Sequence, residues 1–483
     1  MKNSATTALL RSNRFYILLF MLGYAVLALI HWRHSWPALS QGQVFPDLGD
    51  SRLANSALEV SQTLTLLYLF GLYILCLVNW KRRQFTAREV VVIIVGAGLL
   101  AWGALPANST DIFGYIAFGR MAGIYGANPY VHTYSEFADF YSAFVEWDIT
   151  MPYGPVGLPL FILVGRLSEH SVLGSVFVLK LIWLLTHFCN CWLLFRILKA
   201  WQPDPTFGLF LFGLNPLVLV ELMANGHNDG LMILFVLLAI FALQRERHTT
   251  ALWLAMLAAL VKLPGILVWV AFLFYLLRRR AWRALSLGML LSIAILLMLR
   301  VTLFPSAESL ISLTNAGPFT KNSFHELLIE WSGSLSNQLG APMGYETLYS
   351  MDRYIVATLF SCFCLWRFWR IDDRRSLIRE LAYIFLALLI GYAAWFFPWY
   401  VTWLLPLAAL TEARPLRWAI VIFSWTALAL YAFPNYVVTE APLHRLWAVV
   451  RIFIVHFSPL VPLMRGRWWE YRGIQARQQA EGG

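Results

Sequence analysis

Apolar stretches of eighteen or more residues recur along almost the whole of this 483-residue chain. A stretch of that length can cross the hydrocarbon core of a bilayer as an α-helix. The composition agrees, because 59% of the residues are hydrophobic and only 13% are charged, whereas a soluble chain carries about 25% charged residues. The sequence therefore predicts an all-α polytopic membrane protein.

We expect about a dozen spanning helices, together with a half-length hairpin and an interfacial segment. The expected spans lie roughly at 15–32, 58–80, 88–106, 171–198, 206–223, 229–244, 284–304, 353–370, 380–397, 400–412, 416–433 and 446–464. The hairpin covers 249–277 and is broken by VKLPG, and the interfacial segment covers 153–168. Neither piece is long enough to cross.

Lysine and arginine determine the expected orientation. With a cytoplasmic N-terminus and alternating spans, 26 of the 37 Lys and Arg residues fall on the cytoplasmic side, as the positive-inside rule requires. The net charge of +11 is thereby explained without nucleic acid. Both termini are then cytoplasmic, and the first span is a signal anchor because no small-residue cleavage site follows it.

The long polar segments 33–57, 107–152 and 305–352 all lie on the outer side of this topology. A transporter usually has short loops and places its charges at the midplane, between repeated halves. This sequence shows no internal repeat, so chemistry at one membrane face is favoured. A transporter or lipid-glycan flippase remains the alternative from a different class.

Asp111 follows the third expected span directly, in the segment NSTDIFGYIAFGRMAGIYGANPY. Ser109 or Thr110 can cap a helix that runs from Asp111 to about Tyr125. A carboxylate at this point complements a helix N-terminus. It can equally act as a general base at the membrane surface, with Tyr115 one turn along the same helix.

Four motifs in order extend from Asn108 to Pro406: the Asp111 segment, then MPYGPVGLPLFIL, NPLVLVELMANGHNDGLMILFVLLAIFAL and FFPWYVTWLLPL. They resemble the bacterial polyprenyl-phosphate-mannose-dependent alpha-1,6-mannosyltransferases, which belong to the GT-C superfamily of integral-membrane glycosyltransferases. The resemblance implies a GT-C-type fold and a catalytic Asp in the first large outer loop, which Asp111 matches. Here Asp111 follows the third span, so the first two spans would be an N-terminal addition.

The resemblance further implies transfer of mannose from a polyprenyl-phosphate donor to a lipid-linked or cell-envelope glycan acceptor. Glucose and arabinofuranose are alternative donor sugars. Asp111 would take the proton of the acceptor hydroxyl, the leaving phosphate would need cations rather than an acid, and the expected outcome is inversion. No nucleotide-binding Gly-rich loop is visible, so we expect no cofactor beside the lipid-linked donor, and we assign no metal ligand.

The hexapeptide NGHNDG at 225–230 joins two opposed spans on the outer side. Asn, Gly and Asp favour turns, but ionisable groups at membrane depth are functional candidates. With the resemblance, we expect His227, Asn228 and Asp229 to bind sugar hydroxyls or to position Asp111. Metal binding by His227 and Asp229 is an alternative that rests on only two ligands.

Lys262 lies at the tip of the half-length hairpin, where a lone ammonium costs about 3 kcal/mol. Pairing of this ammonium with the donor phosphate would offset that cost. The alternatives are that Lys262 snorkels to water or that it pairs with a distant acid such as Glu221 or Asp229. Further candidates for the donor phosphate are Arg120, Arg300 and Lys321. Arg300 could instead anchor a helix end at the headgroups.

Trp399 and Tyr400 lie in the motif FFPWYVTW, where they would stack on a sugar ring or line a lipid groove; an aromatic belt explains them equally well. We divide the chain into N-terminal membrane helices (1–87), a catalytic module (88–412) and C-terminal helices with a basic tail (413–483). The expected location is the bacterial plasma membrane, with an extracytoplasmic active site among membrane lipids.

Overall fold

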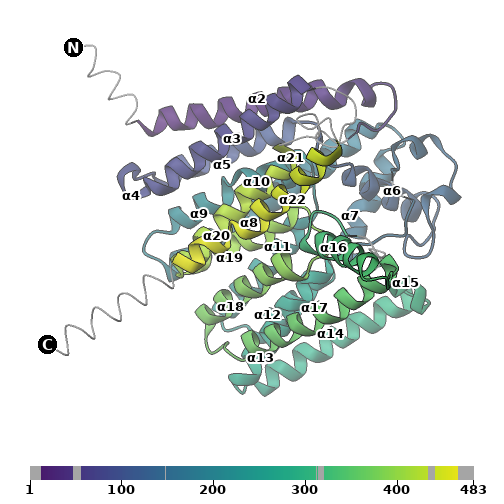
Figure 1. Ribbon diagram of the computed structural model, residues 1–483. Coiled ribbons are helices and arrows are strands. Elements are labelled where there is room, and N and C mark those ends of the chain that lie inside the picture. The colour runs from purple at the N-terminus through teal and green to yellow at the C-terminus, as the bar shows by residue number, and fades with distance from the viewer. Residues whose placement is uncertain are drawn as a thin grey trace, which may run out of the picture. The chain divides into compact units, whose positions relative to one another are not determined.

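The computed structural model describes residues 12–46, 56–146, 148–311, 313, 320–432 and 441–465, and these form helices joined by turns (Figure 1). Within these ranges the only β-type pairing is one parallel bridge between Lys321 and Trp395. The predicted all-α class is therefore confirmed for this part of the chain. Contacts divide the chain into two compact units, Met1–Asn315 with Tyr431–Val437 and Ala316–Leu430 with Val438–Gly483.

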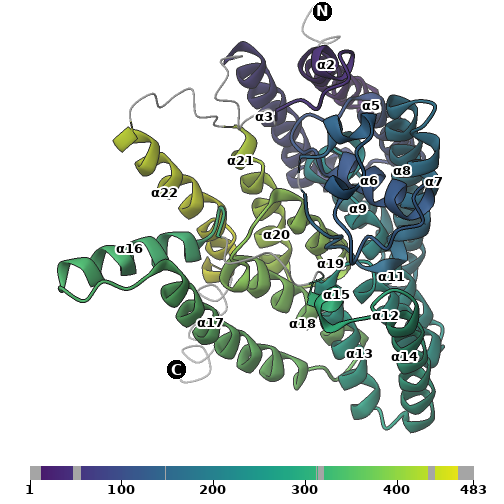
Figure 2. The same cartoon turned by 90° about the vertical axis from the view of Figure 1, so that its right-hand side faces the viewer.

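The first unit holds the longer series of helices. Its helices are α2 (Asn13–Leu39), α3 (Ser56–Val78), α4 (Trp80–Arg83), α5 (Ala87–Gly103), α6 (Asp111–Gly123), η1 (Tyr134–Glu136), η2 (Phe140–Phe144), η3 (Pro155–Gly157), α7 (Leu158–Leu167), α8 (Val172–Trp201), α9 (Pro205–Gly213), α10 (Pro216–Val218), η4 (Leu219–Ala224), α11 (Asp229–Gln244), α12 (His248–Ala259), η5 (Leu263–Gly265), α13 (Ile266–Arg278), α14 (Trp282–Thr302) and α15 (Ala307–Ile311). Helices α2, α3 and α5 lie side by side (Figures 1 and 2).

The second unit is also helical. Its helices are α16 (Phe324–Gln338), α17 (Tyr345–Phe368), α18 (Arg374–Ala387), η7 (Leu388–Tyr392), η8 (Pro398–Trp403), α19 (Leu404–Leu410), α20 (Arg414–Ala427) and α22 (Ala441–Phe457), and α21 (Ala429–Ala432) spans the boundary between the units. The boundary falls inside the catalytic module 88–412 that we expect from the sequence.

The helices long and apolar enough to cross a membrane are α2, α3, α8 and α14, and the bent pair of α9 with α10 and η4 would make a fifth. This finding rests on length and composition and covers the described residues alone. Several apolar helices of this length indicate a membrane protein. The larger number of spans expected from the sequence is not established.

The span expected at 206–223 is bent rather than straight. The chain bends by 45° at the break between α9 and α10, and η4 continues as a π-helix. Pro216 has no N–H to continue the helix, and the Asn215 side chain caps the new helix by accepting from Leu217 N (3.0 Å). The sequence N-P at this point carries that signal.

The half-length hairpin predicted at 249–277 is present. Helices α12 and α13 form its two arms, and the chain turns through η5 at Leu263–Gly265. Pro264 and the preceding extended Lys262 end the helical run there. The short apolar piece at 153–168 forms η3 and α7, as its length predicts.

The long polar segment 305–352 is largely helical. It contains α15, α16 and the first two turns of α17. In α16 the apolar side chains Leu328, Trp331 and Leu335 recur at helical spacing and are all exposed. That periodicity indicates an amphipathic helix, and a count of charged residues does not reveal it.

Helices α6 and α7 cross with their backbones in contact. A Cβ added to Gly119 would lie 1.7 Å from the carbonyl oxygen of Phe161, and one added to Gly165 would lie 2.3 Å from the carbonyl carbon of Gly119. Real Cβ atoms never approach backbone so closely, so only glycine fits at both positions. This crossing fixes the helix that begins at Asp111.

Candidate active site

The chain is unwound between the end of α5 at Gly103 and the start of α6 at Asp111. Its carbonyl groups are bound one after another by side chains from α2 and α8 rather than by a helix. Trp32 Nε1 donates to Gly103 O (2.7 Å), Lys180 Nζ donates to Ala104 O, His31 Nδ1 lies 2.9 Å from Leu105 O, and Ser35 Oγ donates to Pro106 O (2.5 Å). The buried backbone is therefore satisfied while it leads to Asp111.

Asn225 binds the next part of the same segment. Its Oδ1 accepts from the backbone N–H groups of Ala107 (3.3 Å) and Asn108 (3.2 Å), and its Nδ2 donates to Glu221 Oε2 (3.1 Å). The turn continues through Gly226, whose φ of +82° favours glycine. The NGHNDG turn is thereby held directly against the residues that precede Asp111.

Asp111 begins α6, and 23% of its side chain is accessible. The nearby carboxylates of Glu221 and Asp229 are fully buried, so we call Asp111, Glu221, His227, Asp229 and Lys262 the cluster around Asp111. The backbone N–H of Asp111 donates to Ser109 Oγ (3.3 Å), so Ser109 rather than Thr110 supplies the side-chain oxygen at the helix start. The hydroxyl of Tyr153 donates to Asp111 Oδ2 (3.0 Å).

His227 is fully buried between two carboxylates. Its Nδ1 lies 3.5 Å from Asp111 Oδ2, and its Nε2 lies 3.4 Å from Glu221 Oε2. Burial lowers the pKa of His227, but Asp111 and Glu221 together raise it from 6.5 to about 9. The imidazole is therefore a cation at neutral pH. Burial raises the pKa of Asp111, but His227 and Lys262 hold that pKa below its usual value of 3.8.

Lys262 pairs with Asp229, which is the alternative that the sequence left open. Lys262 Nζ donates to Asp229 Oδ2 at 2.7 Å, and both side chains are buried. The ammonium also lies 5.4 Å from the ring centroid of Tyr153. The Tyr153 segment is brought there by backbone bonds, since Gly154 N donates to Val261 O (3.0 Å).

Tyr115 is completely buried one turn along α6 from Asp111. Its hydroxyl donates to Asn228 Oδ1 (3.4 Å), and its ring stacks on Phe161 with centroids 5.0 Å apart. Tyr115 and Asn228 therefore pack α6 against the turn that carries His227. Their contacts with a sugar stay predictions.

Arg120 does not join the cluster around Asp111. Its guanidinium donates to Asp139 Oδ2 (2.5 Å), Tyr134 Oη (2.9 Å) and Ser168 Oγ (2.6 Å), and it is buried. These bonds tie the loop after α6 to the end of α7. Arg120 therefore has a packing role in this structure, and its binding of the donor phosphate stays a prediction.

Arg300 and the remaining candidates make contacts of their own. Arg300 Nη1 donates to Phe304 O just beyond α14, as expected for a group that closes a helix end. The candidates in the second unit are Lys321, which lies 5.4 Å from the ring centroid of Phe397, Trp399, which stacks on the same ring at 4.3 Å, and Tyr400, which stacks on Trp403 at 4.9 Å. Their proposed contacts with donor or sugar stay predictions.

The sequence did not single out Tyr153 or Lys180. Tyr153 has no local signal, because PYGP has the pattern of a rigid turn. Lys180 does have one, since an ionisable residue inside the apolar helix α8 is a candidate by default. No group of three His, Cys, Asp or Glu side chains suited to a metal ion occurs among the described residues.

A family described as alpha-(1->6)-mannopyranosyltransferase, N-terminal domain, matches residues 17–278, more than half of the chain. The chain belongs to this family. The expected resemblance is thereby confirmed, and the match includes Asp111, Tyr153, His227 and Lys262. Arg300, Lys321, Trp399 and Tyr400 lie beyond it.

Curated relatives in the alpha-(1->6)-mannopyranosyltransferase family agree with the match. Alpha-(1->6)-mannopyranosyltransferase A of Mycobacterium tuberculosis is 28% identical over 353 residues, which cover 68% of this chain and 66% of the relative. Alpha-(1->6)-mannopyranosyltransferase A of Corynebacterium glutamicum is 23% identical over 35% of this chain and 36% of its own. Alpha-(1->6)-mannopyranosyltransferase B of the same organism is 25% identical over 31% and 26%. The matches thus span at most about two thirds of these relatives.

The Lys262–Asp229 pair predicts the result of replacing the lysine. Lys262→Met should destabilise the protein by about 3–5 kcal/mol, because it leaves a buried carboxylate unpaired. The double variant Lys262→Met with Asp229→Leu should recover most of that loss. Thermal unfolding of the purified protein, without any donor, measures both. A single variant as stable as wild type would show that the pair does not form.

The raised pKa of His227 predicts a loss of stability at alkaline pH. The charged imidazole contributes fully to the free energy of unfolding below the unfolded pKa of about 6.5. That contribution disappears as the pH rises through the folded pKa of about 9. Between these limits wild type should lose on the order of 3 kcal/mol more than His227→Gln. The exposed His132→Gln is the control and should follow wild type. Parallel pH profiles for all three proteins would contradict the buried cation.

Proposed function

We propose that this chain is a membrane glycosyltransferase of the GT-C type that transfers mannose from a polyprenyl-phosphate donor. The acceptor is a lipid-linked or cell-envelope glycan, and the linkage formed is alpha-(1->6), as in the names of the relatives. Family membership supports the activity, and the geometry around Asp111 supports the mechanism.

One observation carries the mechanism: Asp111 is the accessible end of a buried chain of charges. Glu221 and His227 are fully buried behind it, and only the Asp111 carboxylate is partly open. A carboxylate held ionised at neutral pH can accept a proton from an acceptor hydroxyl that approaches from outside. The sugar then moves to that oxygen with inversion at the anomeric carbon, and the polyprenyl phosphate leaves.

His227 and Tyr153 orient the base. Each approaches the same oxygen, Oδ2 of Asp111, at 3.5 Å and 3.0 Å respectively. The other oxygen, Oδ1, is thereby directed to the acceptor. A carboxylate oriented by two neighbours needs little reorganisation when it takes the proton, which is the advantage of a preorganised site.

Lys262 supplies positive charge for the leaving phosphate. The Lys262 ammonium carries a full positive charge, and Asp229 fixes its position by accepting a hydrogen bond from Nζ. The cation lies close enough to Asp111 to lower the pKa of that carboxylate, so it adjoins the reaction centre. We propose that the donor phosphate binds at Lys262, while Asp229 holds the ammonium in place.

The direct test of the base is Asp111→Asn, which preserves the shape of the side chain and removes its basicity. Transfer of radiolabelled mannose from a synthetic polyprenyl-phosphate mannose should fall by about 10² to 10⁴-fold, with donor binding retained. Glu136→Gln, an exposed acid in the same loop, is the matched control and should transfer at the wild-type rate. If Asp111→Asn keeps more than about a tenth of the wild-type rate, Asp111 is not the base. Asp139 and Asp229 would then be the next candidates for that role.

The proposed location of the site on the extracytoplasmic face rests on the distribution of Lys and Arg. Single cysteines at the exposed positions Ser142 and Ser334, in a chain whose five native cysteines are replaced, should react with an impermeant reagent added to intact cells. A cysteine at Lys81, in the basic α4, should react after lysis alone. Protection of Ser142 and Ser334 with labelling at Lys81 would place the site in the cytoplasm.

A further inference from the structure

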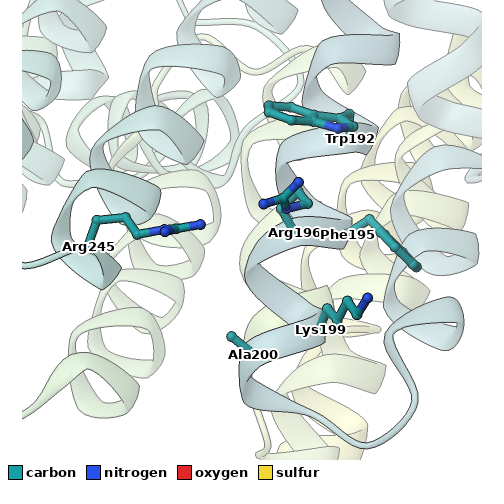
Figure 3. Close-up of a pocket in the computed structure, with 6 residues that line it drawn as sticks. All are labelled: Trp192, Phe195, Arg196, Lys199, Ala200 and Arg245. Carbon is teal, nitrogen blue, oxygen red and sulfur yellow. The ribbon is translucent and has the colours of Figure 1, made fainter.

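A hollow lies near the C-terminal end of α8, which is the end remote from Asp111. It has a volume of about 600 Å³ and lies between the last turns of α8 and the end of α11 (Figure 3). Its lining residues are Trp192, Phe195, Arg196, Lys199, Ala200 and Arg245. None of them belongs to the candidate active site.

The depth of this hollow follows from the length of α8. Lys180, near the start of the helix, binds the segment that leads to Asp111. Arg196 lies sixteen residues further along, which is about 24 Å at 1.5 Å per residue. The hydrocarbon core is about 30 Å thick, so the hollow lies near the headgroup layer of the opposite leaflet from Asp111.

Positive charge dominates the hollow. Arg196, Lys199 and Arg245 are exposed, and within the described chain no carboxylate lies within ion-pair distance of them. Glu246, which follows Arg245, is instead 3.0 Å from His248 Nε2.

The two arginines come from different helices, and Figure 3 shows Arg245 extended towards Arg196. A bond from Gln244 Nε2 to Ile197 O (3.4 Å) holds the end of α11 against α8. Two guanidinium groups that face each other repel, and an anion between them removes the repulsion.

The aromatic residues identify the kind of anion. Trp192 is 55% exposed one turn from Arg196, whose guanidinium lies 5.6 Å from the indole centroid. Exposed tryptophan at this depth is typical of the membrane interface. Basic residues at helix C-termini also complement the helix dipole, but that role requires neither a hollow nor an exposed ring beside it.

We propose that this hollow binds the phosphodiester headgroup of an anionic phospholipid. Arg196 and Arg245 bind the phosphate between them, Lys199 adds a third cation, and Trp192 and Phe195 contact the upper part of the acyl chains. Basic pockets between membrane helices recognise such headgroups in this way. The proposal concerns a site apart from Asp111 and does not depend on the activity.

Native mass spectrometry of the full-length protein, titrated with phosphatidylglycerol, tests the proposal. Wild type should bind one lipid tightly, and Arg196→Gln with Arg245→Gln should lower the affinity about 30-fold, since each basic group contributes a factor of about five. Lys199→Gln alone should lower it about five-fold. The control Lys81→Gln with Arg82→Gln removes the same charge from exposed positions on α4 and should bind like wild type.

Phosphatidylcholine and inorganic phosphate distinguish the possible ligands. Phosphatidylcholine, which has the same acyl chains and no net charge, should bind far more weakly than phosphatidylglycerol. Inorganic phosphate at millimolar concentration should not displace the bound lipid. Equal affinity for both lipids, displacement by phosphate, or an equal loss in the α4 control would each overturn the proposal.

Discussion

A bilayer interior has no hydrogen-bond partners for an exposed backbone, and the arrangement around Asp111 follows from that constraint. The helices satisfy their own N–H and C=O groups, but the chain leaves helix α5 at Gly103 and begins helix α6 only at Asp111. Between Gly103 and Asp111 the backbone groups are therefore bound by side chains, with Trp32, His31 and Ser35 on α2 supplying three of them. Helix α2 therefore supports the backbone segment that leads to Asp111.

The same constraint explains why the charges around Asp111 occur in alternation. An isolated buried charge is costly, whereas paired charges with good geometry are tolerated. Glu221, His227 and Asp111 form one series and Asp229 with Lys262 forms another. Within these two series each charge has a neighbour of opposite sign, and the series that contains Asp111 ends at a partly open carboxylate. The Asp111 carboxylate is thereby the one member of the two series that is partly accessible, apart from the slight exposure of Lys262.

The sequence alone indicated the ionisable residues of this candidate site, because such residues are rare in an apolar chain. Asp111, His227 and Lys262 stand out because ionisable residues seldom occur at such positions, and the hairpin at 249–277 is evident from its length and from Pro264. Tyr153 could not be found in this way, because its role depends on backbone bonds between its segment and the distant residues 260–261. Arg120 has the sequence features of a phosphate ligand, and no local signal predicts its ion pair with Asp139. The Asn215–Pro216 pair is a local signal for the bend. The expected span at 206–223 rests on the length of the apolar run, which carries no information about a bend.

The crossing of α6 and α7 has a consequence for the position of Asp111. Side chains that pack against each other can change rotamer and slide, but a glycine Cα against a carbonyl group has no such freedom. Gly119 and Gly165 thus allow the backbones of the two helices to touch, and this contact leaves little room for α6 to shift against α7. A substitution that adds even one carbon at either glycine must therefore displace the helix that begins at Asp111.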